Sequence, residues 1–197
     1  MNEFWNKRYS TKEYAYGTEP NQFFKQELEK LSPGKILFPA EGEGRNAVFA
    51  ATLGWQVSAF DPSIEGKKKA GLLAKKHSVQ IDFRTEDYEN VSYKKEQFDC
   101  IVLIFAHIHP LKRNEYHQKL ITFLKPEGIL ILEGFSKKQI NNNTGGPRNV
   151  EMLFSKEELQ SDFQSFSNLK CTEPNVLLNE GPFHQGHTSV IRMLGLK

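Results

Sequence analysis

An apolar segment followed by a glycine-rich turn constrains the fold of this chain more than any other feature. Residues 35–40 read KILFPA, and the turn EGEGR and the apolar run NAVFAATL follow directly. The glycines fit the pattern G-x-G-x-x-A, in which glycine permits a sharp turn and lets the backbone approach a ligand. The pattern predicts a strand, a ligand-binding loop and a helix of an α/β fold.

Strand-like and helical patterns alternate along the rest of the chain. Strands are expected at residues 35–40, 55–61, 79–84, 98–105 and 128–135, and helices at residues 21–31, 45–53, 63–77, 115–124 and 154–163. This alternation predicts a parallel sheet with right-handed crossovers, in which the most apolar stretch, FDCIVLIF, is a central strand. Two strand-like runs, near KCTEPNVLL and HTSVIRMLGL, close the chain.

Composition indicates one globular domain over residues 1–197. The chain has 26 basic and 24 acidic residues, and no basic stripe is interleaved with aromatic residues, so no nucleic-acid partner is expected. The lysines at 67–69 and 75–76 predict a solvated helix face. No signal peptide or long apolar run is found, so we expect a cytoplasmic protein with no membrane partner, as a monomer or weak homodimer.

The charges of the glycine loop bear on the identity of its ligand. Asp61 follows the first glycine by about twenty residues, the spacing of a carboxylate that binds ribose hydroxyls. Glu41 and Glu43 would repel the two phosphates of a dinucleotide. S-adenosylmethionine has no phosphate and carries a cationic sulfonium and an ammonium group. The loop therefore favours S-adenosylmethionine over NAD or FAD, and the absence of G-x-x-x-x-G-K-[ST] excludes a P-loop.

With these residues the chain resembles class I S-adenosylmethionine-dependent methyltransferases almost end to end. More narrowly it is similar to the small bacterial tellurite-resistance and thiopurine-methyltransferase-like branch. The segments that carry the resemblance are WNKRYSTKEYAYGTEPNQFF, AEGEGRNAVFAATLGWQVSAFD, IFAHIHP, LKPEGILILEGFSKKQ, NTGGPRNVEMLFSKEEL and EGPFHQGHTSVI. Pro39-Ala40-Glu41 stands where the family usually has an early aspartate.

The resemblance implies a fold and a division of the chain. The fold is Rossmann-like α/β, with a seven-stranded, mostly parallel sheet whose last strand is antiparallel and helices on both faces. Residues 1–20 form an arm or lid, residues 35–135 the cofactor-binding core, and residues 136–197 a substrate-side loop, helix and terminal strands.

The resemblance also implies a cofactor site for S-adenosylmethionine. Its residues are Trp5, Arg8, Tyr9 and Tyr16 in the arm; Ala40, Glu41, Gly42, Gly44 and Asn46 at the glycine loop; Asp61 and Pro62 at the ribose; Glu86, Asp87 and Tyr88 at the adenine; and Phe105 after the fourth strand. The alternative for the arm is simple packing, and for Asp87 a cap at the end of a strand.

Methyl transfer from a sulfonium is an in-line displacement that needs orientation and exclusion of water. His107 and Arg148 are the expected catalytic residues, as a proton acceptor or as partners of an anionic acceptor. His109, His184 and His187 are expected to bind the substrate. The alternatives are histidines bonded to neighbouring loops and a solvated loop arginine. No carboxylate or cysteine completes a metal site, so no metal is expected.

The acceptor is expected to be a small molecule. The N/D-P-P-Y/F motif and the Pro-Cys nucleophile of DNA methyltransferases are absent. By family analogy the acceptor is a thiol, a selenol or a tellurite-like species. Two alternatives stay open: a non-catalytic S-adenosylmethionine-binding sensor or partner protein, and a nicotinamide-dependent reductase.

Overall fold

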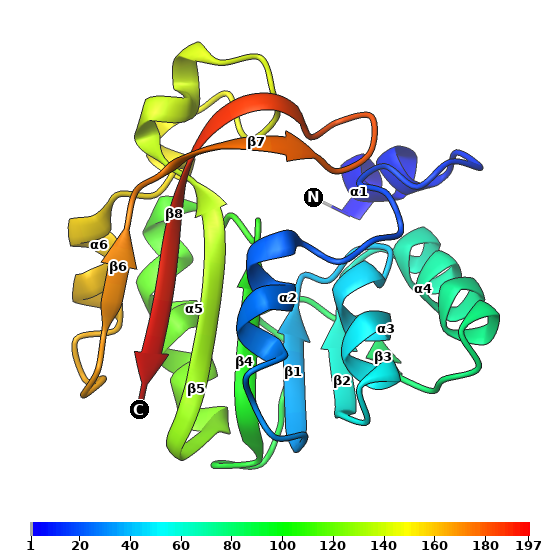
Figure 1. Ribbon diagram of the computed structural model, residues 1–197, viewed down its shortest axis with the longest axis horizontal. Coiled ribbons are helices and arrows are strands. Elements are labelled where there is room, and N and C mark those ends of the chain that lie inside the picture. The colour runs from blue at the N-terminus through cyan, green and yellow to red at the C-terminus, as the bar shows by residue number, and fades with distance from the viewer. Residues whose placement is uncertain (1) are drawn as a thin grey trace. The chain divides into compact units, whose positions relative to one another are not determined.

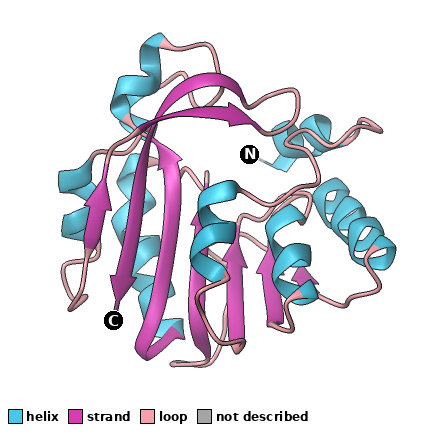
Figure 2. Cartoon of the chain, in the orientation of Figure 1, coloured by secondary structure: helices cyan, strands magenta, loops and turns pink. Residues whose placement is uncertain are grey.

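The computed structural model describes residues 2–197, which form two compact units. The first unit comprises residues 2–92 with residues 180–183, and the second comprises residues 93–179 with residues 184–197. Both units contain helices and strands, as Figure 2 shows, and the expected α/β class with mostly parallel strands is confirmed. No helix among residues 2–197 has the length and apolar character needed to cross a membrane.

The first unit contains a parallel sheet in the order β3-β2-β1. Its strands are β1 (Lys35–Pro39), β2 (Gln56–Phe60) and β3 (Asp82–Arg84), and its helices are α1 (Asn2–Tyr9), α2 (Gln22–Leu28), α3 (Arg45–Thr52) and α4 (Ile64–Lys76). In Figure 1, α2 and α3 lie over β1 and β2, and α1 lies next to α4. Because the strands are parallel, the ends of β1 and β2 place the glycine loop and Asp61 at one edge of this sheet.

Local sequence signals explain where the helices of the first unit begin. The Asn21 side chain accepts a hydrogen bond from the Phe24 N–H at 2.9 Å and caps α2, as expected. Ser63 caps α4 in the same way, by accepting from the Gly66 N–H at 3.1 Å. In contrast, α1 was not expected, because the aromatic and charged residues of the amino-terminal segment show no helical period.

One expectation about α4 is wrong. Lys69 was assigned to a solvated face, but its side chain is buried. Its Nζ forms an ion pair with Glu43 at 2.6 Å and lies 4.8 Å from the centre of the Tyr14 ring. The run of lysines predicted exposure, but helical geometry turns the third lysine toward a buried carboxylate. Lys67 and Lys68 are exposed, as expected.

The second unit has a mixed sheet. Its strands are β4 (Phe98–Ile104), β5 (Leu124–Phe135), β6 (Lys170–Thr172), β7 (Asn175–Asn179) and β8 (Gln185–Leu196), and its helices are α5 (Pro110–Phe123), α6 (Lys156–Asp162) and the 3-10 helices η1 (Lys137–Asn141) and η2 (Val150–Met152). Strands β4 and β5 are parallel, whereas β8 is antiparallel to β5, β6 and β7. The expected antiparallel last strand is confirmed, and the first terminal run is divided into β6 and β7.

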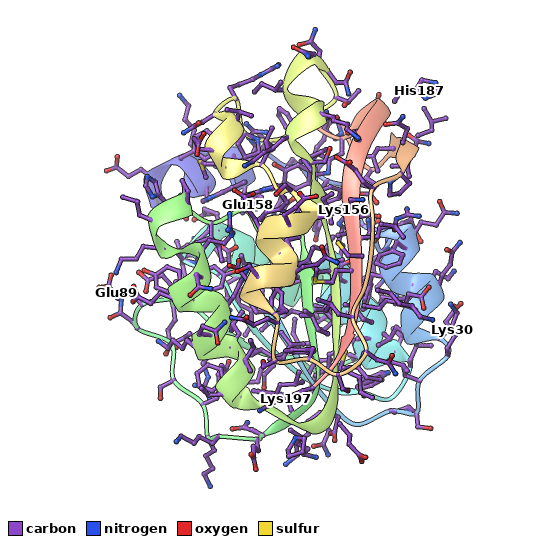
Figure 3. The ribbon with its side chains drawn as sticks, turned by 90° about the vertical axis from the view of Figure 1, so that its left-hand side faces the viewer. Lys30, Glu89, Lys156, Glu158, His187 and Lys197 are labelled. Atoms are coloured by element: carbon purple, nitrogen blue, oxygen red, sulfur yellow. The ribbon has the colours of Figure 1, made fainter. Side chains whose placement is uncertain are left out.

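A polar cluster joins α5 to α6. The expected capping box of α6 is present, with Ser155 and Glu158 as its two members. Asp162 at the end of α6 accepts from Arg113 Nε at 2.7 Å and lies 2.8 Å from Nδ1 of the buried His117. Figure 3 shows Glu158 on the side of α6 that faces α5, where it lies 3.5 Å from Arg113. The cluster fixes the position of α6 on α5.

Candidate functional site

The glycine loop between β1 and α3 has the geometry that its sequence predicts. Gly42 and Gly44 have φ values of 66° and 88°, in the left-handed region that favours glycine. A side chain at Gly42 would place its Cβ 2.6 Å from the hydroxyl oxygen of Tyr9. A side chain at Gly44 would place its Cβ 2.5 Å from Cβ of Ala70 in α4. Both positions therefore require glycine for backbone conformation and for close packing.

Asp61 at the end of β2 closes this loop. Its Oδ2 accepts from the Gly42 N–H at 3.0 Å, and its Oδ1 accepts from the Ser63 N–H at 2.8 Å. The side chain is buried, and this burial raises the pKa of Asp61 to about 6 although both hydrogen bonds favour the charged form. The carboxylate thus connects the glycine loop to the start of α4.

The two glutamates of the loop bind protein groups. Glu41 Oε1 accepts from the N–H groups of Asn46 and Ala47 at 2.9 and 2.8 Å, and so caps α3, whose N-cap residue, Gly44, has no side chain to do so. Desolvation raises the pKa of Glu41 to about 7. Glu43 accepts from the Ala15 N–H at 2.7 Å and pairs with Lys69. The sequence argument placed Glu41 at the cofactor and used the charge of Glu43 only against a phosphate ligand, whereas the structure gives each carboxylate a partner within the protein.

The arm residues gather within the first unit. Tyr9 is buried, stacks on Trp5 with 5.4 Å between ring centres, and has its hydroxyl beside Gly42. Burial, together with the charge of Asp61, raises the pKa of Tyr9. The Arg8 guanidinium lies 3.9 Å from the centre of the Phe183 ring. The arm therefore packs on the glycine loop, and its role as a lid stays a prediction.

The residues after β3 form a turn. Asp87 Oδ1 accepts from the N–H groups of Glu89 and Asn90 at 3.1 and 2.9 Å, and so caps the turn that follows β3. Tyr88 packs edge-on against Phe60 with 5.3 Å between ring centres. The proposed adenine contacts of Glu86, Asp87 and Tyr88, like the ribose contact of Pro62, stay predictions.

In the second unit, Phe105 follows β4 in a strained conformation. Its φ of 52° is unusual for a bulky residue. The ring lies 4.5 Å from the centres of both the Phe135 and the His184 rings. His184 is buried in this aromatic group, whereas His187 is exposed on β8. The two histidines, expected to bind substrate together, are thus in different environments.

His107, expected to be catalytic, has both ring nitrogens in contact with the backbone. Its Nδ1 lies 2.9 Å from the Met152 carbonyl oxygen, and its Nε2 accepts from the Phe135 N–H at 3.1 Å. An acceptor at Nε2 requires a neutral ring with the proton on Nδ1, which donates to Met152. Burial lowers the pKa of His107 to about 4. Because both nitrogens are used, the ring has no site for a substrate proton.

Two other residues that were expected to contact the methyl acceptor, Arg148 and His109, form hydrogen bonds with residues near them in the sequence. Arg148 is exposed and donates to the Asn142 carbonyl oxygen at 3.3 Å and to Asn143 Oδ1 at 3.2 Å, within its own loop. His109 is exposed, and its Nδ1 caps α5 by accepting from the Leu111 N–H at 3.4 Å. Residues 2–197 contain no group of three histidine, cysteine or acidic side chains arranged to hold a metal ion.

Comparisons with known proteins identify similarity over parts of both units. Residues 36–128 match the family model of a methyltransferase domain. The chain is also similar to the glycine/sarcosine N-methyltransferase of Halorhodospira halochloris, with 30% identity over 120 residues. This alignment covers 56% of the chain and 43% of the relative, so the chain spans less than half of that enzyme.

Solved structures support the fold over the whole chain. TehB from Haemophilus influenzae has a TM-score of 0.73 and 17% identity, covering 100% of this chain and 66% of TehB. A structure from work on the conversion of a disulfide bond into a thioacetal group during echinomycin biosynthesis has a TM-score of 0.78 and 17% identity, covering 100% and 90%. Residues 36–128, which include the glycine loop and Asp61, are therefore similar in sequence to a methyltransferase domain, and the chain shares the fold of these solved structures.

Proposed function

We propose that this chain transfers the methyl group of S-adenosylmethionine to a small acceptor. The observation that carries the proposal is the hydrogen bond from the Gly42 N–H to Asp61 within the matched domain. Each carboxylate oxygen of Asp61 accepts one backbone N–H and keeps a second lone pair for a ligand hydroxyl. The residues therefore fit a ribose-containing cofactor, which supplies the activated methyl group when bound.

The available side chains favour an acceptor that needs no general base. His107 offers no free nitrogen, and Arg148 is a cation that cannot take a proton. A thiol has an ordinary pKa of about 8.5, and the fraction present as thiolate is already a strong nucleophile. We therefore propose a soft acceptor of the thiol, selenol or tellurite type. This choice agrees with the tellurite-resistance and thiopurine-methyltransferase-like branch.

N-methylation is a second candidate. It is supported by the 30% identity to a glycine/sarcosine N-methyltransferase. An amine must lose a proton before it attacks, so without a general base its rate would rise steadily with pH toward the pKa of the amine. A thiol substrate would show the same rise but reach a plateau at lower pH.

The test is to measure S-adenosylhomocysteine formed from S-adenosylmethionine with five separate acceptors: a small thiol, a selenol, tellurite, glycine and sarcosine. Turnover with the first three supports the proposal, and turnover with glycine or sarcosine alone selects the second candidate. Binding of S-adenosylmethionine with no turnover of any acceptor favours the sensor. Binding of NADH in place of S-adenosylmethionine contradicts the methyltransferase. The Asp61→Asn variant serves as the control for site-dependent turnover.

A further inference from the structure

A short segment near the carboxyl terminus belongs to the cofactor-binding unit. Residues 180–183, between β7 and β8, group with residues 2–92, whereas the chain on either side of them belongs to the second unit. Figure 1 shows this turn beside the amino-terminal segment, and the Phe183 N–H donates to the Ala15 carbonyl oxygen at 3.4 Å. The segment lies outside residues 36–128, so the family match assigns it no role.

A buried ion pair connects this segment to the glycine loop. Arg45 directly follows Gly44 and begins α3, and its Nη2 lies 2.7 Å from Glu180 Oε2. The two side chains are only 8% and 11% exposed. Arg45 Nη1 also donates to the Tyr16 carbonyl oxygen at 3.1 Å. One guanidinium thus joins the loop, the amino-terminal segment and the turn after β7.

A second route runs from Glu180 through two asparagines. Glu180 Oε1 accepts from Asn21 Nδ2 at 2.9 Å, and the Asn21 N–H donates to Asn46 Oδ1 at 2.9 Å. The Asn46 N–H in turn donates to Glu41 in the glycine loop. The two oxygens of Glu180 therefore lead, through separate contacts, to the two ends of the glycine loop, Arg45 and Glu41.

Backbone packing and an aromatic contact hold the same segment against the arm. Gly181 has a φ of 68°, and a Cβ there would lie 2.6 Å from the Tyr16 carbonyl carbon and 2.8 Å from the Ala15 carbonyl oxygen. The Phe183 ring stacks under the guanidinium of Arg8, next to Tyr9 in α1. Arm and turn therefore meet backbone to backbone beside the loop.

The energetics of a buried ion pair indicate that the Arg45–Glu180 pair positions the loop more than it stabilises the fold. Desolvating two charges offsets most of their attraction, so such a pair adds little net stability. Removing one partner, however, leaves an unpaired buried charge, which destabilises the local structure around it. We propose that Glu180 is a positioning residue for S-adenosylmethionine: through Arg45 and Asn21 it holds the glycine loop in its cofactor-binding conformation.

The experiment is calorimetric titration of the full chain with S-adenosylhomocysteine, well below the melting temperature of every variant. Glu180→Gln is expected to raise Kd by about tenfold or more, which corresponds to a coupling of about 1.4 kcal/mol. Glu180→Asp keeps the charge and is expected to recover part of the affinity. The matched control is Glu133→Gln, which breaks the buried Glu133–Arg192 pair of the second unit. It is expected to lower the melting temperature but to change Kd by less than about twofold.

A double variant keeps the test decisive if Glu180→Gln folds poorly. Arg45→Met with Glu180→Met removes both charges together and leaves no unpaired one, so we expect it to fold. Its Kd should still rise by about tenfold, because the loop loses its connection to the turn. Affinity equal to that of the unaltered chain, in Glu180→Gln or in the double variant, overturns the proposal. Failure of the unaltered chain to bind S-adenosylhomocysteine contradicts the cofactor assignment instead.

Discussion

A polar side chain hydrogen-bonds to the backbone both in the glycine loop of the first unit and in the segment after β4 of the second unit. The two cases differ in whether the side chain can still bind a ligand. Asp61 accepts two backbone N–H groups and retains lone pairs, because each carboxylate oxygen accepts twice. His107 also makes two backbone contacts, but a neutral imidazole has one donor and one acceptor, and both are used. With two backbone contacts each, Asp61 can still accept a hydrogen bond from a ligand, whereas His107 cannot.

The largest expected effect comes from removing the hydrogen bonds of His107. His107→Phe leaves the Phe135 N–H and the Met152 carbonyl without their present partner. Each unsatisfied buried group costs about 1–3 kcal/mol, so the free energy of unfolding should fall by about 2–6 kcal/mol in urea denaturation. His107→Gln can still donate and accept, and it should lose less.

The same variants distinguish a structural from a catalytic role. A general base contributes about 10²- to 10⁴-fold to the rate, so a change in kcat of less than about threefold in His107→Gln indicates a structural residue. A 100-fold loss of kcat, as expected for a lost general base, with unaltered unfolding free energy would reinstate His107 as catalytic and remove the contrast with Asp61.

The next effect concerns ligand binding by the first unit. Hydrogen bonds to a charged group contribute about 1.5–3 kcal/mol, so Asp61→Asn should raise the Kd for S-adenosylhomocysteine by about 10- to 100-fold. The variant removes a buried charge whose pKa is raised, but its amide nitrogen cannot accept from the Gly42 or the Ser63 N–H. These two effects oppose each other, so the free energy of unfolding at pH 7 should change little. Asp82→Asn, at an exposed position of β3, is the matched control and should bind normally. Equal Kd values for all three proteins would contradict the role of Asp61.

The pH dependence of stability should have opposite signs in the two regions. Burial lowers the pKa of His107 from 6.5 to about 4, so its contribution is present above pH 6.5 and is lost as the pH falls toward 4. Burial raises the pKa of Asp61 from 3.8 to about 6. The contribution of its protonated form to stability is therefore complete below pH 3.8 and is lost as the pH rises through 6. Each change is on the order of 3 kcal/mol, since one pKa unit corresponds to about 1.4 kcal/mol.

Urea denaturation between pH 4 and pH 8 measures these contributions. Compared with the unaltered chain, Asp61→Asn should gain stability as the pH rises from about 4 to about 6, and His107→Gln should lose less of its own stability on acidification. Parallel pH profiles for all three proteins would show that neither group has the shifted pKa on which the contrast between the two regions depends.

Sequence patterns predicted those parts of the molecule whose causes lie within a few residues. The cap of Asn21 on α2, the capping box of α6 and the left-handed conformations of Gly42 and Gly44 all depend on near neighbours in the chain. The glycine pattern and the spacing to Asp61 were also predictable, because both are determined within one β-α-β unit.

Contacts between distant segments were not predictable in this way. Arg45 and Glu180 are 135 positions apart, and no local pattern connects them. The partners of His107 are backbone atoms, which any residue at positions 135 and 152 would present. Lys69 was misassigned for a related reason, because its carboxylate partner lies 26 positions away. A charged or imidazole side chain in a sequence predicts that it has a partner, but it does not identify which residue that partner is.

The smallest expected effect is that of Arg148, the other residue predicted to be catalytic. Its guanidinium is exposed and contacts only Asn142 and Asn143 among the hydrogen bonds described for it. Arg148→Ala should therefore change the free energy of unfolding by less than about 0.5 kcal/mol, as for other surface positions. If the acceptor is a neutral or soft species, the acceptor KM should also stay within about twofold, since no charged hydrogen bond is lost. A rise in KM of tenfold or more, with kcat and stability unaltered, would instead place Arg148 on an anionic acceptor. That result would make the long loop after β5 part of the acceptor site, and the second unit would then also bind a ligand through an open polar side chain.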